Sequence, residues 1–258
     1  MANTVYNNKI IEAKAKDLLT TKVNTRSLMT VDTELTANAG MTKTINTYVY
    51  SGVAEELGVG EGNTNRGSVS YTSKDYTVKL VQQAFDYQDE DFMKDNTIVD
   101  NGVAGATQVM TNKMTADFIT ECAKATVAHE APAFGYEAIV DAISKLNLED
   151  ESKLFVLIPN DWKAGLRKDE DYKSARMGEV VYNGQVGTVC GIPVIATGAL
   201  TDEAYVMTNE AVKLFMKKDV EVEQDRDKDT RTNSIYLRTA YVTALVDATK
   251  ICKVTLSA

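Results

Sequence analysis

The sequence predicts an α+β protein whose compact part carries long, extended appendages. Three features indicate this class: a glycine-rich segment between two strand-like stretches (58–68), one long helical pattern (104–126), and a region of alternating buried strands and short helices (132–218). The chain has 258 residues, of which 44% are hydrophobic and 25% charged. It is therefore long enough and apolar enough to bury a sizeable core.

Composition argues against several classes of protein. The net charge of −9 and the isoelectric point near 4.8 argue against a dedicated nucleic-acid-binding protein, which normally presents a basic surface. Cys122, Cys190 and Cys252 lie far apart without a C-x-x-C motif, a pattern typical of a reduced, cytosolic protein. No signal-peptide pattern is present, and no apolar run reaches the ~18 residues of a membrane helix. We expect a soluble protein with no membrane partner.

The N-terminal region, residues 1–47, is predicted to be an arm without a core of its own. Residues 7–22 have the apolar spacing of one short helix, and the Thr- and Asn-rich stretch that follows has no strong period. Such an arm needs another element to pack against.

Two strand-like stretches flank the segment GVGEGNTNRGS (58–68). Residues 47–57 read as one strand, and residues 69–87 as a second, with period-2 alternation at Tyr76, Val78 and Leu80. Residues 69–83 would span ~50 Å when extended, too long for a core hairpin alone. The glycine-rich segment matches neither a P-loop nor a dinucleotide-binding motif, because a strand rather than a helix follows it. We therefore predict a long, exposed two-stranded ribbon with a flexible tip, lying on a partner.

The strongest helical pattern covers residues 104–126, after an acidic stretch, QDEDFMKD, suited to a helix N-terminus. Four large side chains recur at i+4 along it: Met110, Met114, Phe118 and Cys122. This helix would be ~35 Å long, so we expect it to be the spine of the structure.

The region 132–218 is predicted to be a compact mixed subdomain. FGYEAIVDAISKLN has the pattern of an amphipathic helix, KLFVLI that of a buried strand, and WKAGLRK that of a short helix after a capping turn. GTVCGIPVIATGAL and EAYVM read as further buried strands. A long polar loop (172–187) lies between these elements, and loops of that length in compact domains are usually functional. A charged hairpin and a terminal strand complete the chain.

No active site, metal site or cofactor site is predicted. His129 is the only histidine, no nucleophile motif accompanies it, and we expect it to end the long helix. DRDKD (225–229) resembles a calcium loop superficially, but Thr230 and Tyr236 stand where that loop needs Gly and Glu. The cysteines are expected to be small core residues, and Trp162 a packing residue.

This order of elements resembles the tailed-phage major capsid proteins, whose fold is named after phage Hong Kong 97. The resemblance covers essentially the whole chain. The segments in which it is seen are QQAFDYQDEDF, LFVLIPNDWKAGLR, GTVCGIPVI and RTAYVTALVDATKICKVTL. It implies a Hong Kong 97-like capsid fold with these parts: an N-terminal arm (1–47), an extended loop (48–86), a peripheral domain with the spine helix (87–130 and 219–247), and an axial domain (131–218 and 248–258).

The resemblance also implies three contact regions between subunits. The tip of the extended loop would reach a neighbouring subunit through Gly58, Gly60, Glu61, Gly62, Asn63 and Arg66. The late hairpin would meet another capsomer through Asp225, Arg226, Asp227, Lys228, Asp229 and Arg231. The loop along the capsomer axis would contribute Tyr172, Lys173, Arg176 and Glu179.

A non-enzymatic function follows from the resemblance. Copies of the chain would assemble as pentamers and hexamers into an icosahedral head shell, in the host cytoplasm, and enclose double-stranded DNA in the virion without recognising it specifically. A portal and decoration proteins are the further partners this implies. Because no long helix precedes the arm, either a separate scaffolding protein or a missing propeptide is also implied. The tip carries Arg66 and no lysine, with Lys74 and Lys79 further back, so covalent cross-linking is not expected.

Two alternatives stay open. An encapsulin, a nanocompartment shell with the same fold, would enclose protein cargo instead of DNA. A hydrolase using His129 as its base would need the mixed subdomain to supply a nucleophile that no motif shows.

Overall fold

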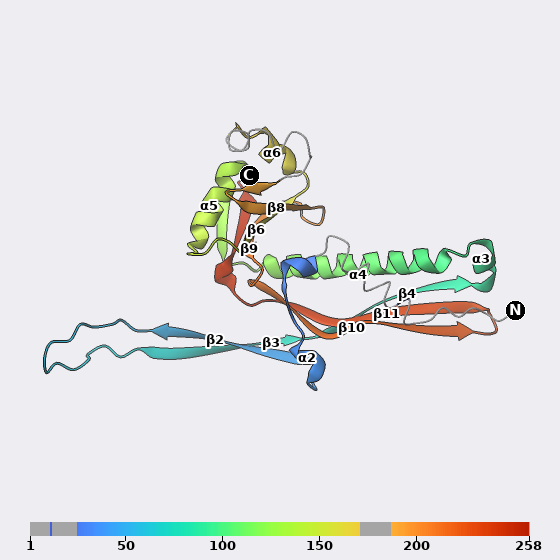
Figure 1. The fold of residues 1–258 in the computed structure, drawn as a ribbon, viewed down its shortest axis with the longest axis horizontal. Coiled ribbons are helices and arrows are strands. Elements are labelled where there is room, and N and C mark those ends of the chain that lie inside the picture. The colour runs from blue at the N-terminus through green and yellow to red at the C-terminus, as the bar shows by residue number, and fades with distance from the viewer. Residues whose placement is uncertain (1–10, 12–24, 171–186, 258) are drawn as a thin grey trace.

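The computed structural model describes residue 11 and residues 25–170 and 187–257. Three parts are visible in Figure 1: a two-stranded ribbon that projects away, a long sheet covered by one long helix, and a smaller mixed subdomain above one end of that helix. The predicted helix at 7–22 and the predicted axis loop, with Tyr172, Lys173, Arg176 and Glu179, lie outside the described residues apart from Ile11. The side chain of Ile11 is buried in one cluster with Val99 and Val103 of the long helix.

The ribbon consists of β2 (Thr42–Ser51) and β3 (Ser68–Thr77), which pair antiparallel from Thr42↔Thr77 to Ser51↔Ser68. β2 begins five residues before the predicted strand at 47 and ends before residue 57. The reason is that its first half is mostly polar, so cross-strand hydrogen bonds define it instead of apolar alternation. The Thr44 hydroxyl, for example, donates to the Asp75 carboxylate at 2.6 Å.

A four-stranded sheet in the order β1-β10-β11-β4 forms the centre of the molecule. Its strands are β1 (Thr30–Asp32), β4 (Lys79–Gln88), β10 (Val212–Asp227) and β11 (Thr232–Leu245). Residues 79–88, which the sequence assigned to the ribbon, thus belong to this sheet. Short helices lie at its margins: η1 (Thr25–Leu28), α2 (Glu34–Ala37) and α3 (Asp89–Lys94), the last beginning with the three predicted acidic residues.

The spine helix α4 (Ile98–Cys122) packs along one face of this sheet (Figure 1). It begins six residues earlier than predicted, and its i+4 stripe of Met110, Met114, Phe118 and Cys122 is buried as predicted. The last three residues of the stripe pack with Leu214, Met216 and Tyr241 on the strands. Met110 packs with Ile235 and Leu237. The opposite face of the sheet presents Phe215, Ala240 and Ala244 to the base of the ribbon.

The mixed subdomain is built on a six-stranded sheet, β5-β12-β9-β6-β8-β7. Its strands are β5 (Val127–Ala131), β6 (Leu154–Pro159), β7 (Thr188–Val189), β8 (Ile192–Thr197), β9 (Glu203–Thr208) and β12 (Ile251–Leu256), with helices α5 (Tyr136–Leu146), α6 (Lys163–Lys168) and η2 (Ala248–Lys250).

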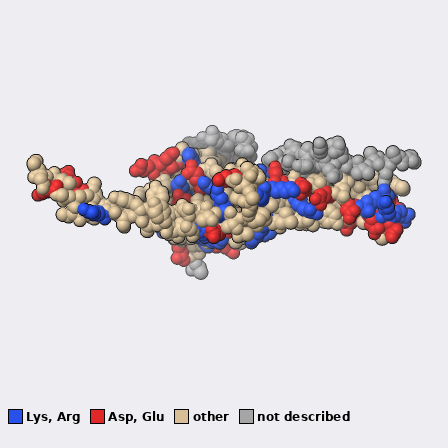
Figure 2. Space-filling view, turned by 90° about the horizontal axis from the view of Figure 1, so that it is seen from below, with Lys and Arg blue, Asp and Glu red and all other residues tan. Residues whose placement is uncertain are grey.

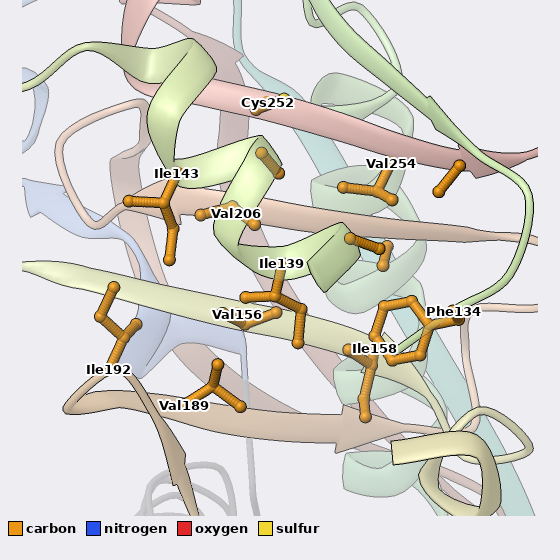
Figure 3. Close-up of a cluster of buried hydrophobic side chains, with 14 of the residues drawn as sticks. Phe134, Ile139, Ile143, Val156, Ile158, Val189, Ile192, Val206, Cys252 and Val254 are labelled. Atoms are coloured by element: carbon orange, nitrogen blue, oxygen red, sulfur yellow. The ribbon is translucent and has the colours of Figure 1, made fainter. Parts of the chain in front are cut away.

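Strand β6 is buried along its whole length, as predicted, because it has a helix on each side. Val156 and Ile158 face α5, where they pack with Ile139 and Ile143 (Figure 3). Phe155 and Leu157 face the other way, toward the end of the spine helix. The sheet therefore joins the mixed subdomain to the long helix, with a separate hydrophobic cluster on each of its faces.

Two single-residue expectations were wrong. His129 does not end the spine helix but lies in β5, which forms because β12, far along the chain, pairs with it in parallel at His129↔Val254. Cys190 is not a core residue: it is exposed in the turn between β7 and β8, with a positive φ of 50°. Cys122 and Cys252 are buried as predicted, and burial raises the pKa of both thiols. None of the helices in the described ranges is long and apolar enough to cross a membrane.

Candidate assembly surfaces

The shaft of the ribbon carries an exposed aromatic face. Tyr48 is paired with Tyr71, and Tyr50 with Val69, across the β2–β3 ladder. Residues opposite each other in such a ladder point to the same side, so these four side chains form one patch. They are 70%, 74%, 63% and 48% exposed, respectively. A contiguous apolar patch on a projecting element is typical of a surface that another protein covers.

Sequence reasoning missed this face because it placed the contact residues at the tip. The alternating YVY and SVSY motifs at 48–50 and 68–71 were the available signal. The register that puts Tyr48 beside Tyr71 could not be read from them, because the 16-residue connection between the strands does not fix a register.

The tip, residues 52–67, is held together by its own carboxylates. The Glu55 carboxylate accepts hydrogen bonds from the backbone N–H and the hydroxyl of Thr64, both at 2.8 Å. These bonds lower the pKa of the Glu55 carboxyl. Glu61 accepts the backbone N–H of Gly58 at 3.0 Å, and Gly60 takes a positive φ of 88° at the turn. The backbone N–H groups of Gly58 and Thr64 are therefore already bonded to carboxylates and do not point at a phosphate site. The segment is a loop tip.

All six predicted tip residues are exposed: Gly58, Gly60, Glu61, Gly62, Asn63 and Arg66. Exposed apolar side chains accompany them at Val53, Leu57 and Val59. The contact of this tip with another subunit stays a prediction.

At the far end of the molecule, the β10–β11 hairpin is fastened to α3. The Asp89 carboxylate accepts hydrogen bonds from Arg226 Nη2 at 2.6 Å and from Asn233 Nδ2 at 2.8 Å. Arg231 Nη2 lies 2.9 Å from Glu90 Oε1. Two of the predicted contact residues therefore already have partners within the chain, and they hold α3 against the hairpin.

The remaining predicted hairpin residues lie at its turn, and all are exposed. Asp227 organises the turn by accepting the Asp229 backbone N–H at 2.9 Å and the Thr230 hydroxyl at 2.8 Å. Lys228 makes no ion pair within the described part of the chain. Figure 2 shows charges of both signs gathered at this end of the molecule. The hairpin is thus an exposed, charge-mixed end, as predicted.

The described surroundings of His129 contain no hydroxyl or thiol nucleophile. Its Nε2 lies 3.8 Å from Asp141 Oδ2, beside a cavity of about 250 Å³. Glu137, Asp141 and Asp169 are the other ionisable residues that line this cavity, and no described Ser, Thr or Cys joins them. Hydrolysis through a serine, threonine or cysteine nucleophile requires such a residue within hydrogen-bond reach of the base. Within the described ranges, no group of three or more His, Cys, Asp and Glu residues could hold a metal ion.

The chain is similar to known capsid proteins in sequence and in structure. It is 28% identical over 247 residues to the major capsid protein of Staphylococcus phage phiMR11, covering 91% of this chain and 87% of the relative. No protein-family model matches it.

Solved structures share its fold at low identity. The capsid protein of cyanophage P-SCSP1u superposes with a TM-score of 0.71 at 11% identity, over 89% of this chain and 86% of that one. The capsid protein of a native GTA particle superposes with a TM-score of 0.71 at 12% identity, over 100% of this chain and 93% of that one. A virus-like particle from Pyrococcus furiosus superposes with a TM-score of 0.68 at 10% identity, over 97% of this chain and 100% of that one. The chain therefore has the Hong Kong 97 fold of these capsid structures, and it is related over nearly its whole length to a phage major capsid protein.

Proposed function

We propose that copies of this chain self-assemble, as pentamers and hexamers, into the icosahedral head shell of a double-stranded DNA phage. The observation that carries the proposal is the aromatic face on the ribbon, around Tyr48 and Tyr71, which projects away from the rest of the chain and is left uncovered. The relation to a phage major capsid protein supports it.

A second copy of the chain is the occupant that best explains the aromatic face. An isolated two-stranded ribbon is marginally stable in water, and this one exposes large side chains that gain about 1.5–3 kcal/mol each when fully buried. Covering the ribbon with a neighbouring subunit supplies the missing packing. When such a contact is repeated around a closed shell, many weak interfaces together give a stable assembly.

The parts of the chain then have separate roles. Residues 48–77 with the tip would reach over a neighbour, and residues 79–130 and 219–247 would form the peripheral domain, since β4 belongs to the central sheet, with the hairpin meeting another capsomer. Residues 131–218 and 248–258 would form the axial domain, with the loop around Tyr172 at the capsomer axis. The N-terminal arm (1–47) would brace the assembly. The net charge of −9 would limit adhesion of the enclosed DNA, which is held without specific recognition.

The first experiment is to express the protein alone and image it by negative-stain electron microscopy, beside a Tyr48→Ser/Tyr71→Ser variant. We expect shells, tubes or capsomer rings from the wild type and loss of assembly in the variant. Circular dichroism should stay unchanged, because exposed side chains contribute little to folding. Thr72→Ser is the matched control, because Thr72 follows Tyr71 on β3 but lies on the opposite face of the ribbon. Assembly of the double variant at wild-type level would contradict the proposed interface.

Assembly inside a host, into a virion with portal, scaffolding or decoration proteins, is the wider setting we propose. A nanocompartment shell that encloses protein cargo is the alternative, since the virus-like particle from Pyrococcus furiosus has the same fold. Nuclease-protected DNA in particles from the producing cells supports the phage shell. Protein content without DNA supports the nanocompartment.

We propose no enzymatic activity for the chain. His129→Ala removes its only imidazole, and we expect this variant to assemble like the wild type. A hydrolytic activity that disappears with this substitution would establish the enzymatic alternative.

A further inference from the structure

The base of the ribbon is attached to the body on the sheet face opposite the spine helix. Tyr76 and Val78 pack there with Leu35 of α2 and with Phe215 and Ala244 of the sheet. Away from this cluster, β2 and β3 form a two-stranded sheet and pair with no other strand in the described part of the chain. Whatever sets the direction of the ribbon must therefore act at its base.

The first attachment is Lys217, which a bulge in β10 places at the base. The register of β10 against β11 shifts between Met216 and Lys218, so Lys217 has no partner in the ladder. Bulges of this kind redirect a side chain out of the regular alternation. The Lys217 ammonium donates to the backbone oxygen of Leu35 at 2.8 Å and to that of Asn38.

Lys217 reaches the ribbon through α2. Leu35 and Asn38 lie in and just after this helix, whose last carbonyl groups have no partner within so short a helix. A cation at this end is favourable. Glu34 of the same helix forms an ion pair with Lys43, the second residue of β2. Lys217 thus holds α2, and α2 holds the first strand of the ribbon.

The second attachment is Tyr76, on the other strand. Its ring is 8% exposed and stacks on Phe215 with centroids 6.5 Å apart. Its hydroxyl donates to the backbone oxygen of Leu245 at 2.8 Å. The backbone N–H of the same Leu245 donates to the Glu121 carboxylate on the spine helix at 3.2 Å. The second strand is therefore tied, through one residue of β11, to the spine helix on the far face of the sheet.

We propose that Lys217 and Tyr76 are positioning residues that together fix the direction in which the ribbon leaves the body. Either attachment alone holds one strand at one point, so the ribbon could still rotate about that point. Two attachments on different strands prevent this rotation. A subunit with a fixed ribbon is preorganised, since it loses less conformational freedom when the ribbon meets a neighbour. Only this last consequence depends on the proposed function.

The test measures the direction of the ribbon directly. Cys190, the exposed native cysteine, is replaced by serine, and cysteines are introduced at Ser70 on the ribbon and Asn112 on the spine helix, both exposed. Spin labels on these two cysteines give a distance distribution by pulsed electron paramagnetic resonance. Mixing a little labelled protein into unlabelled protein keeps the measurement within one subunit, whether or not it assembles.

We expect one narrow distribution for the wild type. Lys217→Met keeps the aliphatic stem and removes the donors, and Tyr76→Phe keeps the ring and removes the hydroxyl. Each should broaden the distribution about twofold, because a second set of orientations becomes populated. Lys217→Arg should restore the narrow distribution. Near-UV circular dichroism of Tyr76→Phe should stay native, because the buried ring is retained.

Two matched controls separate the proposed roles from general effects. Lys213→Met makes the same change on the same strand, at a lysine without a hydrogen bond or ion pair in the described residues. Tyr48→Phe removes a hydroxyl from the shaft. Equal widths for Lys217→Met, Tyr76→Phe and both controls would overturn the proposal, as would a broad wild-type distribution. Absence of particles from the wild type in electron microscopy would instead count against the proposed function, whatever the distances are.

Discussion

Gly102 of the spine helix and Phe85 of β4 are in direct contact, with the aromatic ring occupying the space of a missing side chain. A Cβ added at Gly102 would lie 2.3 Å from Cε2 of Phe85, closer than real Cβ contacts allow. One turn further on, a Cβ at Gly105 would meet nothing within 4 Å. The two glycines therefore have different reasons to be in this helix, and only the first is required by packing.

Substitution by alanine should separate these two positions. Gly102→Ala should lower the free energy of unfolding by about 1–3 kcal/mol, because the ring must move out of a packed site. Gly105→Ala should raise it by about 0.5–1 kcal/mol, because alanine favours the helix and meets no obstacle. Denaturant titration of both variants measures the difference. Equal stabilisation in the two would show that the Phe85 ring gives way freely.

Thr208, at the end of β9, has a buried hydroxyl oxygen without a hydrogen-bond partner among the described residues. Its side chain is 5% exposed, so water gives it little compensation. Thr208→Val replaces the hydroxyl with a methyl group of the same shape and should raise the free energy of unfolding by about 1 kcal/mol. Thr208→Ser keeps the hydroxyl, loses the methyl group, and should lower it by about 0.8 kcal/mol. The opposite order, measured by denaturant titration, would indicate a bound water at this oxygen.

The elements that depend on local pattern could be predicted from the sequence. The buried face of the spine helix follows from the i+4 spacing of Met110 to Cys122, and β6 from its continuous apolar run. The first turns of the spine helix, residues 98–103, were missed, and Gly102 within them is a poor helix former. There the packing of Phe85 on the glycine backbone outweighs local propensity.

The features that depend on distant pairing could not be predicted. β5 exists because β12 pairs with it, from more than 100 residues further along the chain, so His129 was assigned to a helix end instead. The aromatic face needs the register of Tyr48 against Tyr71. Arg226 and Arg231 were read as free contact residues because only the pairing of β4 with β11 brings α3 beside the hairpin.

Glu210, in the turn between β9 and β10, accepts hydrogen bonds from Lys250 at 2.6 Å and Lys153 at 2.9 Å. The bond to Lys250, then that to Lys153, and the two positive charges lower the pKa of the Glu210 carboxyl from 4.5 to about 2. A lowered carboxyl pKa means that the charged form stabilises the fold. This contribution is complete above about pH 4.5 and disappears as the pH falls toward about 2.

Glu210→Gln should therefore be less stable than the wild type near neutral pH, and the two should converge in acid. Unfolding free energies at about pH 7 and about pH 3, in low salt, measure this convergence. Added salt should reduce the difference at neutral pH, because the pairs are solvent-accessible. Glu149→Gln, at an exposed carboxylate without a hydrogen bond or ion pair in the described residues, is the control. A stability difference that does not change with pH would contradict the role of the Glu210 charge.

Lys228, at the turn of the β10–β11 hairpin, differs from the two arginines nearby because it has no ion-pair partner among the described residues. Arg226 and Arg231 are held by Asp89 and Glu90, whereas Lys228 is exposed and makes no ion pair in the described residues. If the hairpin meets acidic groups of another copy, Lys228→Glu should slow assembly and change its salt dependence. The unfolding free energy should change by less than about 0.5 kcal/mol, as for most surface substitutions.

Light scattering during assembly, followed by electron microscopy, measures the effect of Lys228→Glu. Lys79→Glu makes the same charge change at an exposed lysine of β4, away from the hairpin turn, and should assemble at the wild-type rate. Lys228→Arg keeps the charge and should also assemble normally. Because steering between charged surfaces depends on ionic strength, the defect of Lys228→Glu should shrink as salt is added. Normal assembly of Lys228→Glu in low salt would mean that the hairpin turn is not a contact between subunits, and the aromatic face of the ribbon would then be the surface to map first.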